Sequence, residues 1–156
     1  MSNDELTYNW EFGDNTTGDG VTTTHNYQAP GSYLVNLMVS DGELDEGSTW
    51  EAVKFAGQKR LNNLMVILDY NKITACQRIS LEPIEGKISN FGWLTKRIDG
   101  HSLWQVETAL QQAEKPLMIV ADKIKGKGVS YMEDSIEWHY RNLTQELLEQ
   151  ALRENG

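Results

Sequence analysis

Basic residues, cysteine and long apolar runs are scarce in this chain of 156 residues, and each shortage excludes a class of protein. Lys and Arg number 14 against 23 Asp and Glu, so the formal net charge is -9, and nucleic acid is excluded as a partner because phosphate contacts need cations. The single Cys76 excludes an internal disulfide and fits a reducing compartment. No apolar run approaches a membrane span, and the acidic N-terminus is unlike a signal peptide, so we expect a cytoplasmic protein that does not enter a membrane.

Charge and composition change part of the way along the chain. Five acidic residues and no Lys or Arg precede Ser40, and the first basic residue is Lys54. The early segment is rich in Thr, Asn, Gly and Asp, whereas the later part alternates apolar runs with helix-forming stretches. This change predicts a boundary near residue 40, with one unit at 1–40 and another at 41–156.

The early segment has the pattern of β-strands joined by turns. Tyr8, Trp10 and Phe12 alternate with polar residues, and the run 33–39 alternates in the same way. This second run must serve as the strand before Asp41, yet Asn36 interrupts one of its faces, so Asn36 needs a partner or the strand lies at a sheet edge. Turns are predicted at 13–15 and 18–20, and a β-prone stretch at 21–27.

The later part predicts strands in alternation with helices. This order is typical of an α/β fold with a parallel, layered sheet, here carrying an N-terminal antiparallel β segment. Ser102 and Thr144 are expected to cap helices, and Pro83 is tolerated in a first helical turn. Four tryptophans, Trp10, Trp50, Trp93 and Trp104, are expected to be buried or half-buried packing residues. Helices are predicted at 47–61, 81–91, 102–112 and 144–154, and strands at 64–68, 93–98 and 116–121.

Two polar clusters follow predicted strands, at 40–47 and at 69–72. Because the carboxyl ends of neighbouring parallel strands form the ligand-binding edge of an open α/β sheet, Asp41 and Asn71 are expected to lie close together. Their oxygens suit a hard divalent cation, and Gly42 lets a backbone N–H approach phosphate. The alternative is that Asp41 and Gly42 form an ordinary turn and that Asn71 caps a helix.

These clusters also match a family signature, Gly-Asp-Gly followed further along by Asn. Here Ser40 replaces the first glycine, and Asp41, Gly42 and Asn71 keep the other positions. Together with the motifs below, residues from about 37 to 156 resemble the thiamine-diphosphate-binding half of a transketolase, most like the amino-terminal subunit of the split enzymes. The further motifs are Glu46-Gly47-Ser48-Thr49-Trp50-Glu51-Ala52, Asp99-Gly100-His101, Lys125-Gly126-Lys127-Gly128 and Glu137-Trp138-His139.

The resemblance implies a cofactor, thiamine diphosphate, bound through Mg²⁺ or Ca²⁺. Asp41, Asn71 and the backbone carbonyl of Ile73 would ligate the metal, and Gly42 would donate its N–H to the diphosphate. Lys125 would lie near the diphosphate, or its loop is merely flexible. The strands and histidines that precede this signature in the family are absent from the chain.

The resemblance also implies catalytic roles for three residues. Glu46 and Glu51 match acids that join a carboxylate relay between paired active sites, and His139 matches a residue near the sugar. For both glutamates we favour the alternative of a solvated helix start, which the helix dipole stabilises. A histidine such as His139 is more often structural than catalytic, and His101 is expected to fix its own loop.

A second resemblance lies in the early segment. The run Tyr8 to Asp14, then His25-Asn26-Tyr27, then Gly31 to Leu37 resembles the second half of a polycystic kidney disease (PKD) repeat, an immunoglobulin-like β-sandwich. Glu11 replaces the usual Asp, and the first strands of the sandwich are missing. The chain is therefore interpreted as a chimera of a partial PKD-like segment at 1–40 and a partial transketolase domain at 41–156.

The combined reading is a fragment of a transketolase amino-terminal subunit that binds thiamine diphosphate and is not catalytically competent alone. By resemblance, its partner is a transketolase C-terminal subunit, because the glutamate that activates the cofactor lies on a separate domain. Half-domains expose apolar surface, so a homodimer is also expected. The rival interpretations are a non-enzymatic folded chimera without retained activity and a PKD-like adhesion or carbohydrate-binding module.

Overall fold

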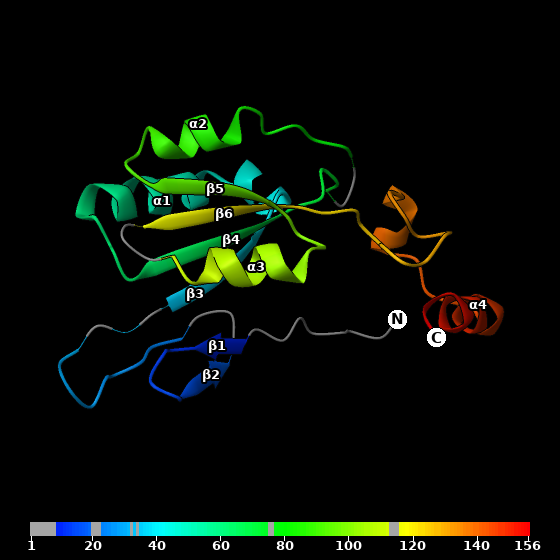
Figure 1. Cartoon of the computed structure of the whole chain (residues 1–156), viewed down its shortest axis with the longest axis horizontal. Coiled ribbons are helices and arrows are strands. Elements are labelled where there is room, and N and C mark those ends of the chain that lie inside the picture. The colour runs from blue at the N-terminus through cyan, green and yellow to red at the C-terminus, as the bar shows by residue number, and fades with distance from the viewer. Residues whose placement is uncertain (1–8, 20–22, 32, 34, 75–76, 113–115) are drawn as a thin grey trace.

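Four parallel strands form the centre of the fold (Figure 1). The computed structural model describes residues 9–19, 23–31, 33, 35–74, 77–112 and 116–156. The strand order is β3-β4-β6-β5, and the register aligns Ser40, Asp69, Ala121 and Ile98 in one row near the carboxyl ends. The α/β prediction with a parallel sheet is therefore confirmed. The strands are β3 (Val35–Ser40), β4 (Leu64–Tyr70), β5 (Leu94–Asp99) and β6 (Leu117–Asp122).

The helices follow the sequence pattern closely. The Ser102 and Thr144 hydroxyls accept from the backbone N–H groups of Gln105 and Leu147, so both predicted caps are confirmed. One helix is shorter than predicted, because Pro83 precedes it as the N-cap instead of lying in its first turn. The α-helices are α1 (Gly47–Lys59), α2 (Ile84–Ser89), α3 (Leu103–Leu110) and α4 (Gln145–Asn155), and the 3-10 helices are η1 (Gly42–Asp45) and η2 (Ile136–His139).

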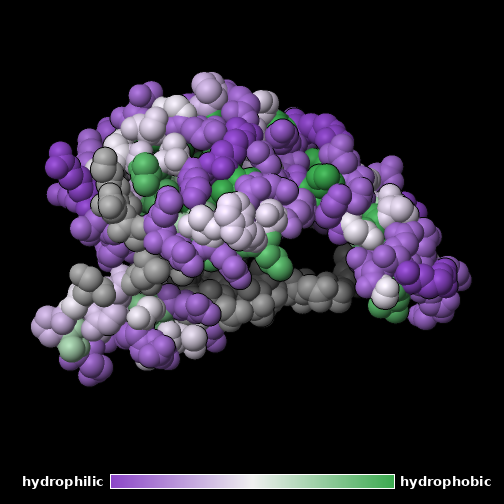
Figure 2. All heavy atoms as spheres, in the orientation of Figure 1, coloured by the Kyte–Doolittle hydropathy of each residue, from purple (hydrophilic) through white to green (hydrophobic). Residues whose placement is uncertain are grey.

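Helices cover the two faces of the sheet unequally (Figure 1). Helices α1 and α2 pack on one face, where a core forms around Leu68, Ile84 and Val120. Helix α3 packs on the other face against a smaller core that includes Ile119. On that second side Met38 is 70% exposed, and apolar residues reach the surface along α3 (Figure 2).

The tryptophans divide between these environments. Trp93 is buried and donates from Nε1 to the Val53 carbonyl at 2.8 Å, and half-buried Trp50 donates to the Leu44 carbonyl at 2.6 Å. The packing prediction is wrong for Trp104, which is 72% exposed on α3. Helix α3 needs only one apolar face to cover its part of the sheet, and Trp104 lies outside it. The side chain of Trp10 lies outside the described residues.

The N-terminal segment forms a separate antiparallel hairpin below β3 in the view of Figure 1. Strand β1 (Asn9–Glu11) pairs with β2 (Thr17–Asp19) through bends at 13–15. The turn predicted at 18–20 is wrong for its first two residues, because pairing with β1 overrides their turn composition. Residues 23–27 are not in a strand, and 20–22 lie outside the described residues.

Four rings of this segment form two stacked pairs that meet edge to face at His25 and Tyr27, 4.6 Å apart. The Phe12 and His25 rings are stacked at 4.2 Å, and the Tyr27 and Tyr33 rings at 3.9 Å. Asp14 binds His25 Nε2 at 2.7 Å and the Thr16 hydroxyl at 2.5 Å, and the second of these bonds is the main reason that the pKa of Asp14 is lowered. Five residues from the three runs that carry the PKD resemblance, Phe12, Asp14, His25, Tyr27 and Tyr33, therefore lie together.

Strand β3 lies at an edge of the parallel sheet. Within the residues that the structure describes, no strand pairs with its outer side. This position agrees with the pattern around Asn36, which pairs in register with Met65. In the described part of the chain, no helix is both long enough and apolar enough to cross a bilayer.

Candidate functional site

Asp41 follows the end of β3 and is almost completely buried, with 1% exposure. Its Oδ2 accepts a hydrogen bond from the backbone N–H of Lys72 at 2.5 Å. Burial raises the pKa of this carboxyl, while N–H groups of Lys72, Gly42, Ile73 and Asn71 oppose the rise. It is the one charged side chain that is buried among the described residues, and its direct partners are backbone amides and not cations.

A tight turn after β4 supplies these amides. The amide oxygen of Asn71 accepts from the Ile73 N–H at 3.0 Å, and its Nδ2 donates to Asp69 Oδ1 at 3.3 Å. Lys72, which lies between Asn71 and Ile73, has a φ of 65°, in the left-handed region of backbone conformation. Asp69 is held in turn by Lys123 at 3.1 Å. These contacts fix which way the Asn71 amide points and leave a lone pair on its oxygen.

The turn replaces the simpler interpretation of Asn71 as a helix cap. The next helix, α2, begins at Ile84 with Pro83 as its N-cap, so Asn71 caps nothing. Asp41 does precede the 3-10 helix η1, but its side chain makes no capping hydrogen bond there. The two polar residues are instead joined through Lys72, as the sheet topology predicts.

Gly42 and Ser40 flank the buried carboxylate. A Cβ on Gly42 would meet the Thr74 methyl at 3.6 Å, which is ordinary contact, so the loop 71–74 packs beside this glycine. The Ser40 backbone N–H and hydroxyl both donate to Glu43 Oε2, at 2.6 and 2.9 Å. The hydroxyl that replaces the family's glycine is therefore engaged with η1. Ile73 is buried.

An open pocket of about 490 Å³ brings Asn71 near the basic loop after β6. Half-buried Lys125 lines it together with Lys123 and Lys127. His101 Nε2 accepts from the Ile124 N–H at 2.8 Å, so its ring carries the proton on Nδ1. The prediction that His101 fixes its own loop is therefore wrong about the partner, because the ring holds the loop after β6 instead.

Sequence reasoning placed Asp69 and Lys72 in a polar cluster without giving them a role, and it missed Lys123. Asp69 accepts from the Asn71 amide and is paired with Lys123, and Lys72 donates its backbone N–H to Asp41. Each of these residues lies within one or two residues of a strand end. This position was the signal in the sequence that could have pointed to them as site residues.

The structure does not bring Glu46, Glu51 and His139 to Asp41. Glu46 is the exposed N-cap of α1 without a capping bond, and Glu51 is exposed on that helix. His139 is exposed in η2 and contacts the Tyr140 ring at 4.6 Å. Among the described contacts none joins these three side chains to Asp41 or Asn71. Their catalytic roles stay predictions, and the exposed glutamates fit the solvated helix start.

The donor set at this edge suits one kind of metal. In the described part of the chain, no group of three or more His, Cys, Asp or Glu side chains is placed so that it could hold a metal ion. An ion would instead bind a mixed set, with the Asp41 carboxylate, the Asn71 amide oxygen and a backbone carbonyl. Such oxygens fit Mg²⁺ or Ca²⁺, and a cation would neutralise the buried charge of Asp41.

Comparison with known proteins identifies the class of the parallel sheet. The sheet has the fold of transketolase structures, and transketolase homology extends over most of the chain. A protein-family model for the PKD domain matches residues 1–54.

Particular relatives make the class more specific. The chain is 42% identical over 128 residues to the 6-deoxy-6-sulfo-D-fructose transketolase subunit SqwG of Clostridium sp. (strain MSTE9), covering 77% of this chain and 46% of that protein. It is 36% identical over 140 residues to mouse transketolase, covering 86% of this chain and 22% of that protein. The crystal structure of Campylobacter jejuni transketolase matches with a TM-score of 0.73 and 27% identity, over 78% of this chain and 20% of that chain. The chain therefore spans less than half the length of these relatives.

The two matches share part of the chain. The PKD match ends at residue 54, whereas β3 (Val35–Ser40) belongs to the parallel sheet and α1 begins at Gly47. Residues 35–54 are thus part of the transketolase-like sheet and its first helix in the structure. The division at residue 40 stays a prediction.

Proposed function

We propose that this chain binds thiamine diphosphate through a divalent cation at the carboxyl edge of its parallel sheet. One observation carries the proposal: the buried Asp41 carboxylate is held against the Asn71–Ile73 turn by the Lys72 N–H at 2.5 Å. The homology to transketolases supports the choice of cofactor.

Each contact to the cofactor has a candidate residue. Asp41, Asn71 and the Ile73 carbonyl would ligate Mg²⁺ or Ca²⁺, Gly42 would donate its N–H to the diphosphate, and Lys125 would add a positive charge. When bound, thiamine diphosphate supplies carbanion stabilisation for ketol transfer. The chain's own residues would bind the metal and the diphosphate, and the Asp41 carboxylate is buried among them.

We further propose that the chain is not catalytically competent alone. It covers 46% of one transketolase subunit and 22% of a full transketolase, and Glu46, Glu51 and His139 are exposed and make no described side-chain contact with Asp41. A transketolase C-terminal subunit would complete the site, since the relative SqwG is itself a subunit. The incompletely covered sheet face fits such a partner or a second copy, and the single cysteine fits the cytoplasm.

Metal binding tests the proposal directly. Mn²⁺ replaces Mg²⁺ in oxygen sites, and its free ion is counted by electron paramagnetic resonance. In the presence of thiamine diphosphate, we expect saturable Mn²⁺ binding that Asp41→Asn and Asn71→Ala each weaken by about 100-fold or more. Asp45→Asn, an exposed carboxylate in η1, is the matched control and should bind like the wild type.

A second candidate is a folded chimera that has kept the sequence of a cofactor site without its activity. The PKD match beside the transketolase homology and the exposure of Glu46, Glu51 and His139 favour it. Mn²⁺ binding that is absent, or equal in Asp41→Asn and Asp45→Asn, would support this candidate over the cofactor site.

A further inference from the structure

Tyr70, the last residue of β4, immediately precedes the Asn71 turn and is fully buried. Its hydroxyl accepts from the Leu81 N–H at 3.1 Å, and its carbonyl accepts from the Lys123 N–H at 3.0 Å. Two cations lie by its ring, the Arg97 guanidinium at 5.3 Å and the Lys72 ammonium at 5.4 Å from the centroid. Tyr70 therefore connects the turn to Arg97 on β5.

Arg97 is itself held from three sides. It donates to both oxygens of Asp122 at 2.7 and 2.9 Å, to Glu85 at 3.0 Å and to Glu82 at 2.7 Å. These carboxylates come from the end of β6 and from the start of α2 and the residues before it. With 29% side-chain exposure, the guanidinium is partly shielded from water, so these bonds hold its plane beside Tyr70.

Lys72 is the residue in the turn that most needs support. Its positive φ is unfavourable for a residue with a Cβ, and this conformation aims its N–H at Asp41. Its ammonium lies by the ring of Tyr70, whose other cationic neighbour is Arg97. Tyr70 and Arg97 line the same pocket as Asn71 and Lys72, yet neither donates to Asp41 among the described contacts.

We propose that Arg97 and Tyr70 are positioning residues that hold the Asn71–Ile73 turn in the conformation that binds Asp41. Fixing Arg97 between three carboxylates fixes Tyr70, and Tyr70 fixes Lys72 and the amide that Asp41 accepts. The consequence for the metal and diphosphate rests on the proposed function, whereas the positioning of the turn does not.

Amide hydrogen exchange, followed by NMR on the free protein, measures the positioning itself. In Arg97→Met and Tyr70→Leu, we expect the Lys72 and Ile73 amides to exchange at least about 10-fold faster relative to the Ile119 amide in β6. Arg97→Lys keeps the charge but loses the planar fork, so its rates should lie between those of the wild type and Arg97→Met.

Arg141 supplies a matched control elsewhere in the chain. It pairs with Glu137 at 3.4 Å and lies over the Trp138 ring at 5.0 Å, so Arg141→Met removes the same kinds of contact without touching the turn. We expect normal Lys72 exchange in this variant. Equal acceleration of Lys72 and Ile119 in Arg97→Met, or unchanged Lys72 exchange, would overturn the positioning role. If Arg97→Met does not fold, the ratio of the Lys72 to the Ile119 exchange rate in Arg97→Lys decides the question in the same way.

Calorimetry with Mg²⁺ and thiamine diphosphate separates the two proposals. If both hold, Arg97→Met raises the Kd by at least about 10-fold, as loss of a supporting residue commonly does. A wild-type chain that binds nothing, with Lys72 exchange still faster in Arg97→Met, overturns the proposed function alone. Normal affinity in Arg97→Met with normal Lys72 exchange overturns the positioning role alone.

Discussion

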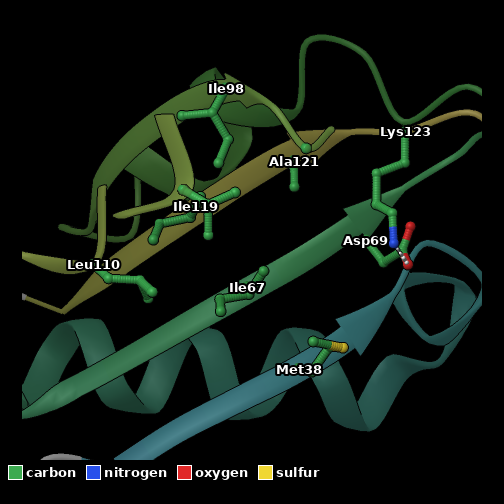
Figure 3. A pocket seen from close by; sticks show the side chains of 10 residues that line it. Met38, Ile67, Asp69, Ile98, Leu110, Ile119, Ala121 and Lys123 are labelled. Carbon is green, nitrogen blue, oxygen red and sulfur yellow. Dashed lines mark hydrogen bonds and ion pairs between the residues drawn. The ribbon is translucent and has the colours of Figure 1, made fainter. Parts of the chain in front are cut away.

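The two faces of the parallel sheet are built from the same strands but differ in how completely they are covered. On the side of α1 and α2, Leu68, Val120 and Ile88 are fully buried. On the side of α3, the centre is buried around Ile119, but the β3 edge leaves Met38 largely exposed. A hollow of about 160 Å³ lies on this side, lined by residues from all four strands and α3. Its labelled side chains are drawn in Figure 3.

This difference shows that the sheet can form a buried core on one face while the other face stays partly exposed. The covered face supplies a core that stabilises the sheet and fixes Asp41 at its edge. The α3 face leaves apolar side chains at the surface, which marks it as an interaction surface or an aggregation liability. The chain spans less than half the length of the transketolase relatives described above.

The largest expected effect comes from matched truncations on the two faces. Ile88→Ala removes a fully buried side chain from α2 and should lower the free energy of unfolding by about 3 kcal/mol. Met38→Ala on the other face should cost less than about 0.5 kcal/mol, because little apolar surface is lost from the core. Urea unfolding measures both, and similar losses would erase the difference between the faces.

Self-association probes the incompletely covered face. We expect the wild type to sediment as a dimer at high concentration, and Met38→Lys combined with Trp104→Glu to weaken the dimer about 10-fold or more, which corresponds to about 1.4 kcal/mol. Phe55→Glu is the control, since Phe55 is 56% exposed on α1, the helix of the covered face. A wild type that sediments as a clean monomer at every concentration would contradict the dimer.

Acidity should affect the buried edge of the sheet through Asp41. Burial raises the pKa of the Asp41 carboxyl above its ordinary value of 3.8. Protonation of Asp41 therefore stabilises the metal-free fold, fully at pH values below 3.8. This stabilisation is lost as the pH rises through the raised pKa. A metal competes with this proton, so Mn²⁺ affinity should fall as the pH falls through the same range. The substitution Asp41→Asn should remove the contribution of Asp41 to the pH dependence of the free energy of unfolding. Identical pH profiles in wild type and variant would show that Asp41 does not titrate in this way.

The smallest effect is expected in the N-terminal hairpin. Tyr27→Ala removes the stack on Tyr33 and the 2.9 Å bond from the Tyr27 hydroxyl to the Phe12 carbonyl. Because these contacts stay within the early segment, the sheet should unfold with a free energy changed by less than about 0.5 kcal/mol. Thermal unfolding followed at 222 nm measures this change, and a loss above about 1 kcal/mol would make the hairpin part of the same cooperative unit.

Local patterns predicted the sheet well because each signal was short-range. Ser102 and Thr144 cap their helices as expected, and the strand ends place Asp41 beside the Asn71 turn. Of the two alternatives that Asn36 raised, a partner for its side chain or a strand at a sheet edge, the structure shows the edge strand. In these cases, periodicity and caps agreed with the tertiary structure.

Features that depend on distant partners were not predictable. Thr17–Asp19 has turn composition, and only pairing with β1 makes it a strand. The exposure of Trp104 could not be predicted, because the apolar pattern of α3 does not show how much of the helix the sheet covers. Arg97 gathers partners from residues 82, 85 and 122, a spacing that no local motif contains.

Calorimetric titration of thiamine diphosphate into the wild-type chain, with excess Mg²⁺ and again with a chelator, tests the cofactor site most directly. We expect saturable heat with Mg²⁺ and none with the chelator, because in the proposed site the diphosphate would be held through an ion bound by Asp41 and Asn71. Absent heat with Mg²⁺, or equal heat in both titrations, would contradict a metal-bridged site at the edge of this sheet.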